Sequence, residues 1–173
     1  MKIKKSHIIG WLVLGMIVFT SYYLLGGFTE VELTVKEHQP YYLTGKQYIG
    51  SITDRSFDSL VEATHKAYSN GVLSGSFSIC FMGNPDEQDT IEVFVGTWHT
   101  EEIVVPNGYI QKKHEGGKAI FASIEAEAVV APSATETNEK IIAYANENNL
   151  SIKGRFIERY DDDFKIVTIV PVE

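Results

Sequence analysis

The chain has 173 residues, of which 44% are hydrophobic and 22% charged, and this length suits one domain with an appendage better than two domains. The formal net charge is −8, but Lys2, Lys4 and Lys5 all precede the first acidic residue, Glu30. Of the 15 basic residues, 12 remain beyond these three, against 23 acidic ones, a net charge of −11. Such a surface repels phosphate backbones, so we expect no nucleic-acid partner, whereas cationic small molecules are compatible with it.

The first predicted element is an uncharged apolar stretch from Ile8 to Leu25. As a helix it would be about 27 Å long, close to the thickness of the hydrocarbon core of a bilayer. The lysines before it and the acidic residues after it predict a membrane anchor whose N-terminus is cytoplasmic. The alternative is a cleaved signal peptide, but the run ends in Tyr22-Tyr23-Leu24-Leu25-Gly26-Gly27, which is a poor cleavage site.

We therefore expect a single-pass membrane protein that contacts the lipid bilayer through Ile8 to Leu25. Residues 1–27 would form the cytoplasmic tip and the transmembrane anchor. Residues 28–173 would form one extracytoplasmic domain.

Two rounds of strands and helices follow in the same order. In the first round we expect strands at 31–37 and 41–52, a helix capped by Ser56 and ended by Gly71, and strands at 76–82 and 90–98. In the second round we expect strands at 102–106 and 118–127, then a helix that opens with the capping box Ser133 and Glu136. Strands at 154–160 and 164–172, around an acidic turn at 161–163, complete the chain.

The two rounds also share residues at one spacing. Gly45-Lys46 and Ser51-Ile52 recur as Gly117-Lys118 and Ser123-Ile124, which indicates an internal duplication. We therefore predict an α+β fold in which duplicated β-α-β-β units form one antiparallel sheet with two helices on one side and a central cleft. A single transmembrane helix would precede this domain.

Residues that carry metal, redox or phosphate chemistry form no recognisable pattern. Cys80 is the single cysteine, so no internal disulfide can form. The five histidines lack the spacing of metal ligands, and the sequence has neither a glycine-rich phosphate loop nor a nucleophile motif. We expect no metal, no cofactor and no assigned catalytic residue.

Two segments of the second round carry a more specific pattern. One is Val105-Pro106-Asn107-Gly108-Tyr109, followed by His114-Glu115-Gly116, and the other is Phe156-Ile157-Glu158-Arg159-Tyr160, followed by the apolar strand at 166–172. Together with the duplicated layout they resemble the GyrI-like, or effector-binding, family of bacterial small-molecule-binding domains, over about residues 30–173. The chain departs from that family in two ways: a predicted membrane helix replaces the DNA-binding helices, and the connection at 125–136 is longer and more acidic.

The resemblance implies a cleft between the two halves, lined with aromatic rings, in which one carboxylate pairs with cationic lipophilic ligands. The family position of that carboxylate falls on Glu158. A cation would supply the charge that a buried glutamate lacks, and aromatic rings would add cation–π attraction. On the residues alone, Glu158 could instead pair with Arg155, Arg159 or Lys165, or face solvent. The other candidate ligand-binding residues are aromatic: Tyr42, Phe81, Trp98, Tyr109 and Tyr160.

The function that we expect is a membrane-anchored domain that binds cationic or amphipathic lipophilic compounds without transforming them. One alternative is a hydrolase of strained or toxic small molecules, with Glu158 as general base and Tyr109 or Tyr160 as acid. A second alternative is a protein-interaction module without a ligand.

Overall fold

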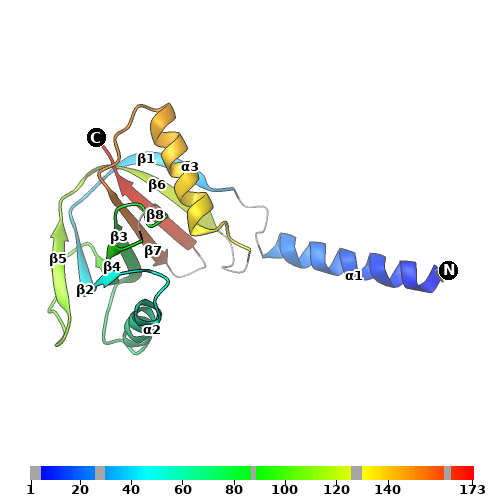
Figure 1. Cartoon of the computed structure of the whole chain (residues 1–173), viewed down its shortest axis with the longest axis horizontal. Helices are drawn as coiled ribbons and strands as arrows, with labels where there is room; N and C mark the ends of the chain where they lie inside the picture. The colour runs from blue at the N-terminus through cyan, green and yellow to red at the C-terminus, as the bar shows by residue number, and fades with distance from the viewer. Residues whose placement is uncertain (1–4, 26–29, 87–88, 126–129, 162–164) are drawn as a thin grey trace.

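The computed structural model describes residues 5–25, 30–86, 89–125, 130–161 and 165–173 (Figure 1). Over these ranges the chain forms three helices and eight strands. In chain order they are α1 (Lys5–Leu24), β1 (Glu32–His38), β2 (Tyr41–Gly50), α2 (Arg55–Ser69), β3 (Ser76–Met82), β4 (Ile91–His99), β5 (Ile110–His114), β6 (Gly117–Glu125), α3 (Ala134–Glu147), β7 (Arg155–Asp161) and β8 (Lys165–Pro171).

The strands of the described ranges form one antiparallel sheet in the order β1-β6-β8-β7-β3-β4-β2-β5. This order is symmetric about the central pair of β3 and β7. Outward from the centre come β4, β2 and β5 on one side, and β8, β6 and β1 on the other. A symmetric order of this kind is what an internal duplication produces.

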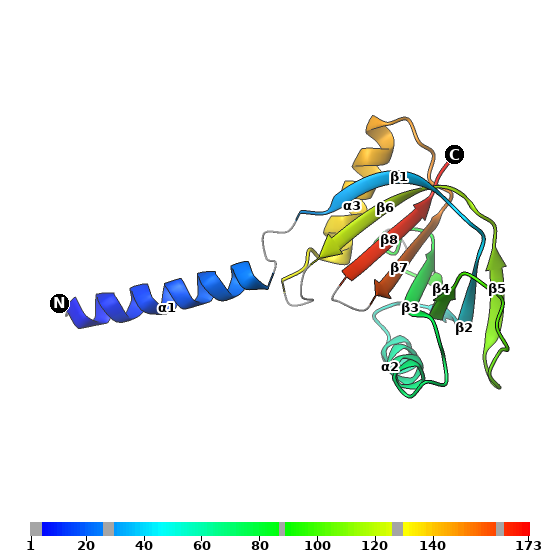
Figure 2. The ribbon, with the colours of Figure 1, turned by 180° about the vertical axis from the view of Figure 1, so that it is seen from behind.

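The first correction to the predicted fold class concerns the number of strands in each half of the domain. A β-α-β-β unit supplies three strands, whereas each half also has a leading strand, β1 or β5. These leading strands are exchanged: β1 precedes β2 but pairs with β6, and β5 precedes β6 but pairs with β2. Through the links at 39–40 and 115–116 the four strands form one bent two-stranded ribbon from one edge of the sheet to the other (Figure 2).

The second correction concerns the N-terminal helix. The expected membrane-spanning helix was wrong, and with it the single-pass, extracytoplasmic localisation, and nothing in the described residues supports the expected bilayer contact. Among the described residues, no helix combines the length and the apolarity that crossing a membrane requires. Helix α1 runs from Lys5 to Leu24, so its first turn includes the polar residues Lys5, Ser6 and His7.

Local signals were more reliable than the long-range ones. The capping box of α3 is confirmed: the Glu136 N–H donates to Ser133 Oγ at 3.2 Å, and the Ser133 N–H donates to Glu136 Oε2 at 2.9 Å. Helix α2 begins earlier than predicted, since Asp54 rather than Ser56 is its N-cap. Residues 162–163 of the predicted acidic turn and 126–129 of the acidic connection lie outside the described residues.

The strand expected at 102–106 does not form. The Tyr109 N–H donates to the Pro106 carbonyl at 3.2 Å and closes a turn, and pairing with β2 begins only at Ile110. Proline has no N–H to contribute to a ladder, so the strand begins after the turn rather than before it.

Helices α2 and α3 both cover one face of the sheet (Figures 1 and 2). Phe57 of α2 and Ile141 and Ala145 of α3 belong to the same buried cluster as the apolar side chains of β3 and β4. Neither helix covers the opposite face, which we call the helix-free face. Yet Tyr41, Leu43, Cys80, Phe94, Ile157 and Ile169 are buried there.

Burial without a covering helix follows from the curvature of the sheet. Arg155 of β7 forms a hydrogen bond with His114 of β5, although β3, β4 and β2 lie between these strands in the sheet. The sheet therefore curls toward its helix-free face. Two glycines allow part of this: Gly45 and Gly96 face each other across β2 and β4, where a Cβ on either would collide with the backbone of the other strand.

Candidate functional site

A cavity of about 400 Å³ opens between α2 and the central strands of the sheet, on the helix-covered face. We call it the cleft. One wall is the face of α2, and the other is formed by the facing pair β3 and β7, where the two halves of the chain meet. Its lining residues are Val61, His65, Tyr68, Phe77, Ile79, Tyr160 and Asp161.

The walls of the cleft are mainly aromatic. Phe77 contacts the three other lining rings, with its ring centroid 5.1 Å from His65, 5.9 Å from Tyr68 and 5.9 Å from Tyr160. Phe77 and Tyr160 are direct partners across the β3–β7 ladder, and side chains on directly opposite positions of an antiparallel pair share one face. The aromatic lining therefore follows from the register of the two central strands.

Glu158 lies next to this lining. It shares its face of β7 with Tyr160, two residues further along, and it is opposite Ile79, which lines the cleft. The Tyr160 hydroxyl donates a hydrogen bond of 2.7 Å to Glu158 Oε2. Glu158 itself is not among the lining residues, so the ring of Tyr160 and its hydroxyl connect the cleft with the carboxylate.

The electrostatic environment of Glu158 disfavours its charge. Burial raises the pKa of the Glu158 carboxyl above its ordinary value, the bond from Tyr160 lowers it in part, and the nearby charge of Asp86 raises it again. Asp86 is held in place by α3, since Thr135 Oγ1 and Asn138 Nδ2 donate to its carboxylate at 2.8 and 3.2 Å. Two acidic groups, one from each half of the chain, thus lie close enough to interact electrostatically.

The three basic residues that could have paired with Glu158 are engaged elsewhere. Arg159 binds Asp161 at 2.7 Å, Lys165 binds Glu125 at 3.2 Å, and Arg155 bonds to His114. Arg155 and Arg159 alternate with Glu158 along β7, so they lie on the helix-free face. Within the described parts of the chain, no cationic side chain forms an ion pair with Glu158.

The other candidate ligand-binding residues are spread over the domain. Phe81 is buried in the core on the helix-covered face. Trp98 lies on the helix-free face, stacked on Tyr41 with ring centroids 3.7 Å apart. Tyr109 precedes β5, with Lys46 Nζ 5.1 Å above its ring, and Tyr42 pairs with His99 and Lys113 in β2. The structure thus brings Glu158 and Tyr160 together, and the other four candidates are not among the residues that line the cleft.

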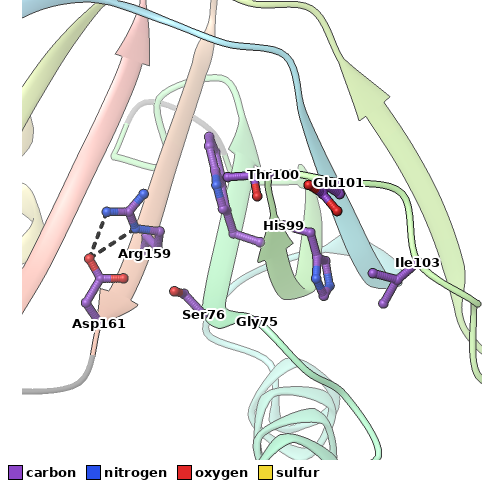
Figure 3. A pocket seen from close by; sticks show the side chains of 9 residues that line it. Gly75, Ser76, His99, Thr100, Glu101, Ile103, Arg159 and Asp161 are labelled. Carbon is purple, nitrogen blue, oxygen red and sulfur yellow. Dashed lines mark hydrogen bonds and ion pairs between the residues drawn. The ribbon is translucent and has the colours of Figure 1, made fainter.

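A second cavity, of about 500 Å³, lies at the end of β3, β4 and β7 (Figure 3). Trp98, Ser76 and Arg159 form part of its lining, with Thr100 and Glu101 from the segment after β4. The guanidinium of Arg159 faces this cavity while it is bonded to Asp161. The charges of Arg159 and Asp161 therefore compensate each other within the protein.

Sequence reasoning missed the contribution of α2 to the cleft. The spacing of Phe57, Val61 and Tyr68 in the sequence is typical of one buried helix face, but it does not indicate which part of that face borders open space. His65, which is exposed and packs edge-on against Phe77, carried no signal of its own. Whether α2 lines the cleft depends on its contacts with the sheet, and these contacts join residues far apart in the sequence, so local patterns do not predict them.

A scan against protein-family models finds no match, and a comparison with curated proteins finds none either. Solved structures do match. The integron cassette protein VCH_CASS2, from the mobile metagenome of Vibrio cholerae, has a TM-score of 0.58 at 11% identity, over 84% of this chain and 99% of that one. SAV2435 bound to tetraphenylphosphonium has a TM-score of 0.55 at 13% identity, over 82% of this chain and 94% of that one. The C-terminal domain of EcmrR has a TM-score of 0.53 at 13% identity, over 83% of this chain and 98% of that one.

At these identities the matches establish the fold alone. That fold is consistent with the GyrI-like effector-binding fold. The same family is the one whose motifs the two segments of the second round resemble. The fold is therefore that of a domain with two related halves, and the cleft of this chain lies between α2 and the central strands β3 and β7.

Proposed function

We propose that this domain binds small molecules and that its cleft takes a lipophilic cation, with Glu158 as the counter-charge. The observation that carries the proposal is a partly buried carboxylate, next to an aromatic cavity, with no cationic partner among the described residues. Burying a charge without a partner is costly, so such a carboxylate is retained where a ligand completes the pair.

The chemistry of the cleft fits an organic cation better than a metal ion or a hydrophilic cation. Rings of Phe77, Tyr68 and Tyr160 offer apolar contact and cation–π attraction. Asp86 adds a second negative charge, which favours a cation near Glu158. The volume of about 400 Å³ falls in the range of small-molecule sites, roughly 300–1,000 Å³.

The choice of probe follows from a protein of the same fold, SAV2435, whose structure contains bound tetraphenylphosphonium. We expect calorimetric titration of the full-length chain with tetraphenylphosphonium to show saturable binding. Triphenylphosphine oxide, which is similarly aromatic but neutral, should bind at least tenfold more weakly, because it cannot pair with the carboxylate.

Substitution of Glu158 tests whether binding of the cation depends on this carboxylate or on the overall negative charge of the domain. Glu158→Gln should reduce affinity for tetraphenylphosphonium by about tenfold or more and leave that for the neutral compound unchanged. Glu62→Gln is the matched control, because Glu62 is exposed on α2 and the charge change is the same. Equal losses in the two variants, or no loss in either, would overturn the role of Glu158.

A further inference from the structure

Asp161 lines both the cleft and the second cavity. It is the last residue of β7 and directly follows Tyr160. Alternation along the strand gives it the same face as Arg159, and its position at the strand end lets it border the cleft as well. The cleft therefore has a carboxylate in its own lining, in addition to Glu158, which the Tyr160 hydroxyl connects to it.

Arg159 compensates the charge of this carboxylate. Its Nε and Nη2 both donate to Asp161 Oδ2, at 3.2 and 2.7 Å (Figure 3). The two side chains are only 25% and 26% exposed, and partial burial strengthens the attraction between opposite charges. The guanidinium also lies over the ring of Trp98, 5.7 Å from its centroid, which helps to hold it beside Asp161. The cleft thus has a lining carboxylate whose counter-charge comes from a residue outside the lining.

The acidic groups around Glu158 are in a different state. Asp86 accepts hydrogen bonds from neutral donors, Thr135 and Asn138. In the described parts of the chain neither Asp86 nor Glu158 has a cationic partner. Positions 158 and 161 are separated by about 10 Å of extended strand. A ligand in the cleft would therefore meet an uncompensated negative charge near Glu158 and a compensated one at Asp161.

We propose that Arg159, by compensating Asp161, restricts the cleft to ligands with a single cationic centre. This inference rests on the proposed function, because it assumes that a cation binds beside Glu158. A second cationic centre at Asp161 would lose its hydration next to a carboxylate that Arg159 already neutralises, and it would lie near the like charge of the guanidinium. An apolar part of the ligand at the same place meets neither cost. The ligand class is therefore a monocation whose remaining atoms are apolar.

The test compares two ligands of the same shape and different charge. Methyl viologen is an elongated aromatic dication, and 1-methyl-4-(4-methylphenyl)pyridinium has a carbon atom in place of its second charged nitrogen. Calorimetric titration of the full-length chain gives the affinity for each. We expect the original chain to bind the dication no more tightly than the monocation, within about threefold.

Variants of the ion pair should change this selectivity in opposite directions. Arg159→Gln leaves Asp161 uncompensated, so it should raise the affinity for methyl viologen about tenfold and that for the monocation less than about threefold. Asp161→Asn leaves Arg159 uncompensated, so it should weaken the binding of both ligands, and that of the dication more. The double variant should lose the gain of Arg159→Gln, because the carboxylate responsible for it is gone. Asp161→Asn barely changes the size of its side chain, so it tests the proposal even if Arg159→Gln does not fold.

Lys118→Gln is the matched control for net charge, because Lys118 is exposed on β6 and lines neither cavity. It should leave the ratio of the two affinities unchanged. The proposal is wrong if the original chain prefers the dication by about tenfold, or if neither variant of the ion pair changes that ratio.

Glu158→Gln separates this inference from the proposed function. If it weakens binding of the monocation while the ratio stays insensitive to Arg159 and Asp161, the role of Arg159 alone is refuted. If neither ligand binds, or if Glu158→Gln has no effect on binding, the proposed function fails and the role of Arg159 fails with it.

Discussion

Glu158 combines two properties that conflict in the unliganded protein. It is a carboxylate whose charged form burial disfavours, and its one hydrogen bond in the described part of the chain comes from Tyr160. In the folded protein its pKa is raised above the ordinary value of about 4.5. The protonated form therefore contributes stability that is fully present below that ordinary value and is lost as the pH rises through the raised pKa.

Glu158→Gln should for this reason stabilise the unliganded protein at neutral pH, because glutamine resembles the protonated acid and carries no charge to desolvate. We expect its melting temperature to exceed that of the original chain by a few degrees at pH 7. The difference should shrink toward zero near pH 4. Thermal unfolding between pH 4 and pH 8 measures this, and a variant that is less stable at pH 7 would show that the charge is compensated.

The pairing of Glu158 with Tyr160 could be predicted from sequence, since residues two apart on a strand share a face. The lack of a cationic partner for Glu158 among the residues that the structure describes could not be predicted. Three basic residues within seven positions were all plausible partners, and alternation along β7 together with the fold of β8 and β5 sends each of them to a different acceptor.

Helix α3 shows how much a single terminus can contribute. Its capping box satisfies backbone donors at the start of the helix, and the Ser133 side chain accepts from the Glu136 N–H. Ser133→Ala should lower the free energy of unfolding by about 1 kcal/mol. Denaturant unfolding measures the loss, and Ser59→Ala, at an exposed interior position of α2, should cause none.

Strands β2 and β4 depend on a pair of glycines. A Cβ on Gly96 would run into the Thr44 carbonyl and the Cα of Gly45, and both are backbone atoms that cannot move aside. Gly96→Ala should therefore cost about 3 kcal/mol of unfolding free energy. Gly15→Ala in α1 is the control, because a Cβ there meets nothing within 4 Å. Equal stabilities of the two variants would contradict the close approach of β2 and β4.

The elements that sequence predicted best are those set by neighbours in the chain. The bounds of β3 and the cap of α3 follow from alternation and from two residues three apart. The N-terminal helix forms over Lys5–Leu24, but the prediction that it crosses a membrane was wrong. The exchange of β1 and β5 leaves no local signal, since either strand would satisfy its alternation at either edge of the sheet.

At the scale of the molecule, the ribbon makes each half of the domain depend on the other. The outer edge of β2 is covered by β5, from the second half, and the outer edge of β6 by β1, from the first. A chain divided between β4 and β5, within residues 100–109, should therefore yield two fragments that do not unfold cooperatively alone. Mixing them should restore cooperative unfolding and tetraphenylphosphonium binding. Circular dichroism and calorimetry test this, and a stable isolated fragment would contradict it.

The exchanged strands also constrain the order in which the chain can fold as it is synthesised. The ladder partner of Glu32 is Ser123, so β1 leaves the ribosome long before the strand that it pairs with exists. During that interval β1 has no ladder partner, and β2 still lacks the cover of β5. Unpaired strand edges are the surfaces through which nascent chains associate wrongly. The strand exchange that joins the two halves of the folded domain therefore leaves unpaired strand edges on the partly synthesised chain, which makes it a substrate for chaperones. Slow translation across residues 87–125 would prolong the time for which these edges are unpaired.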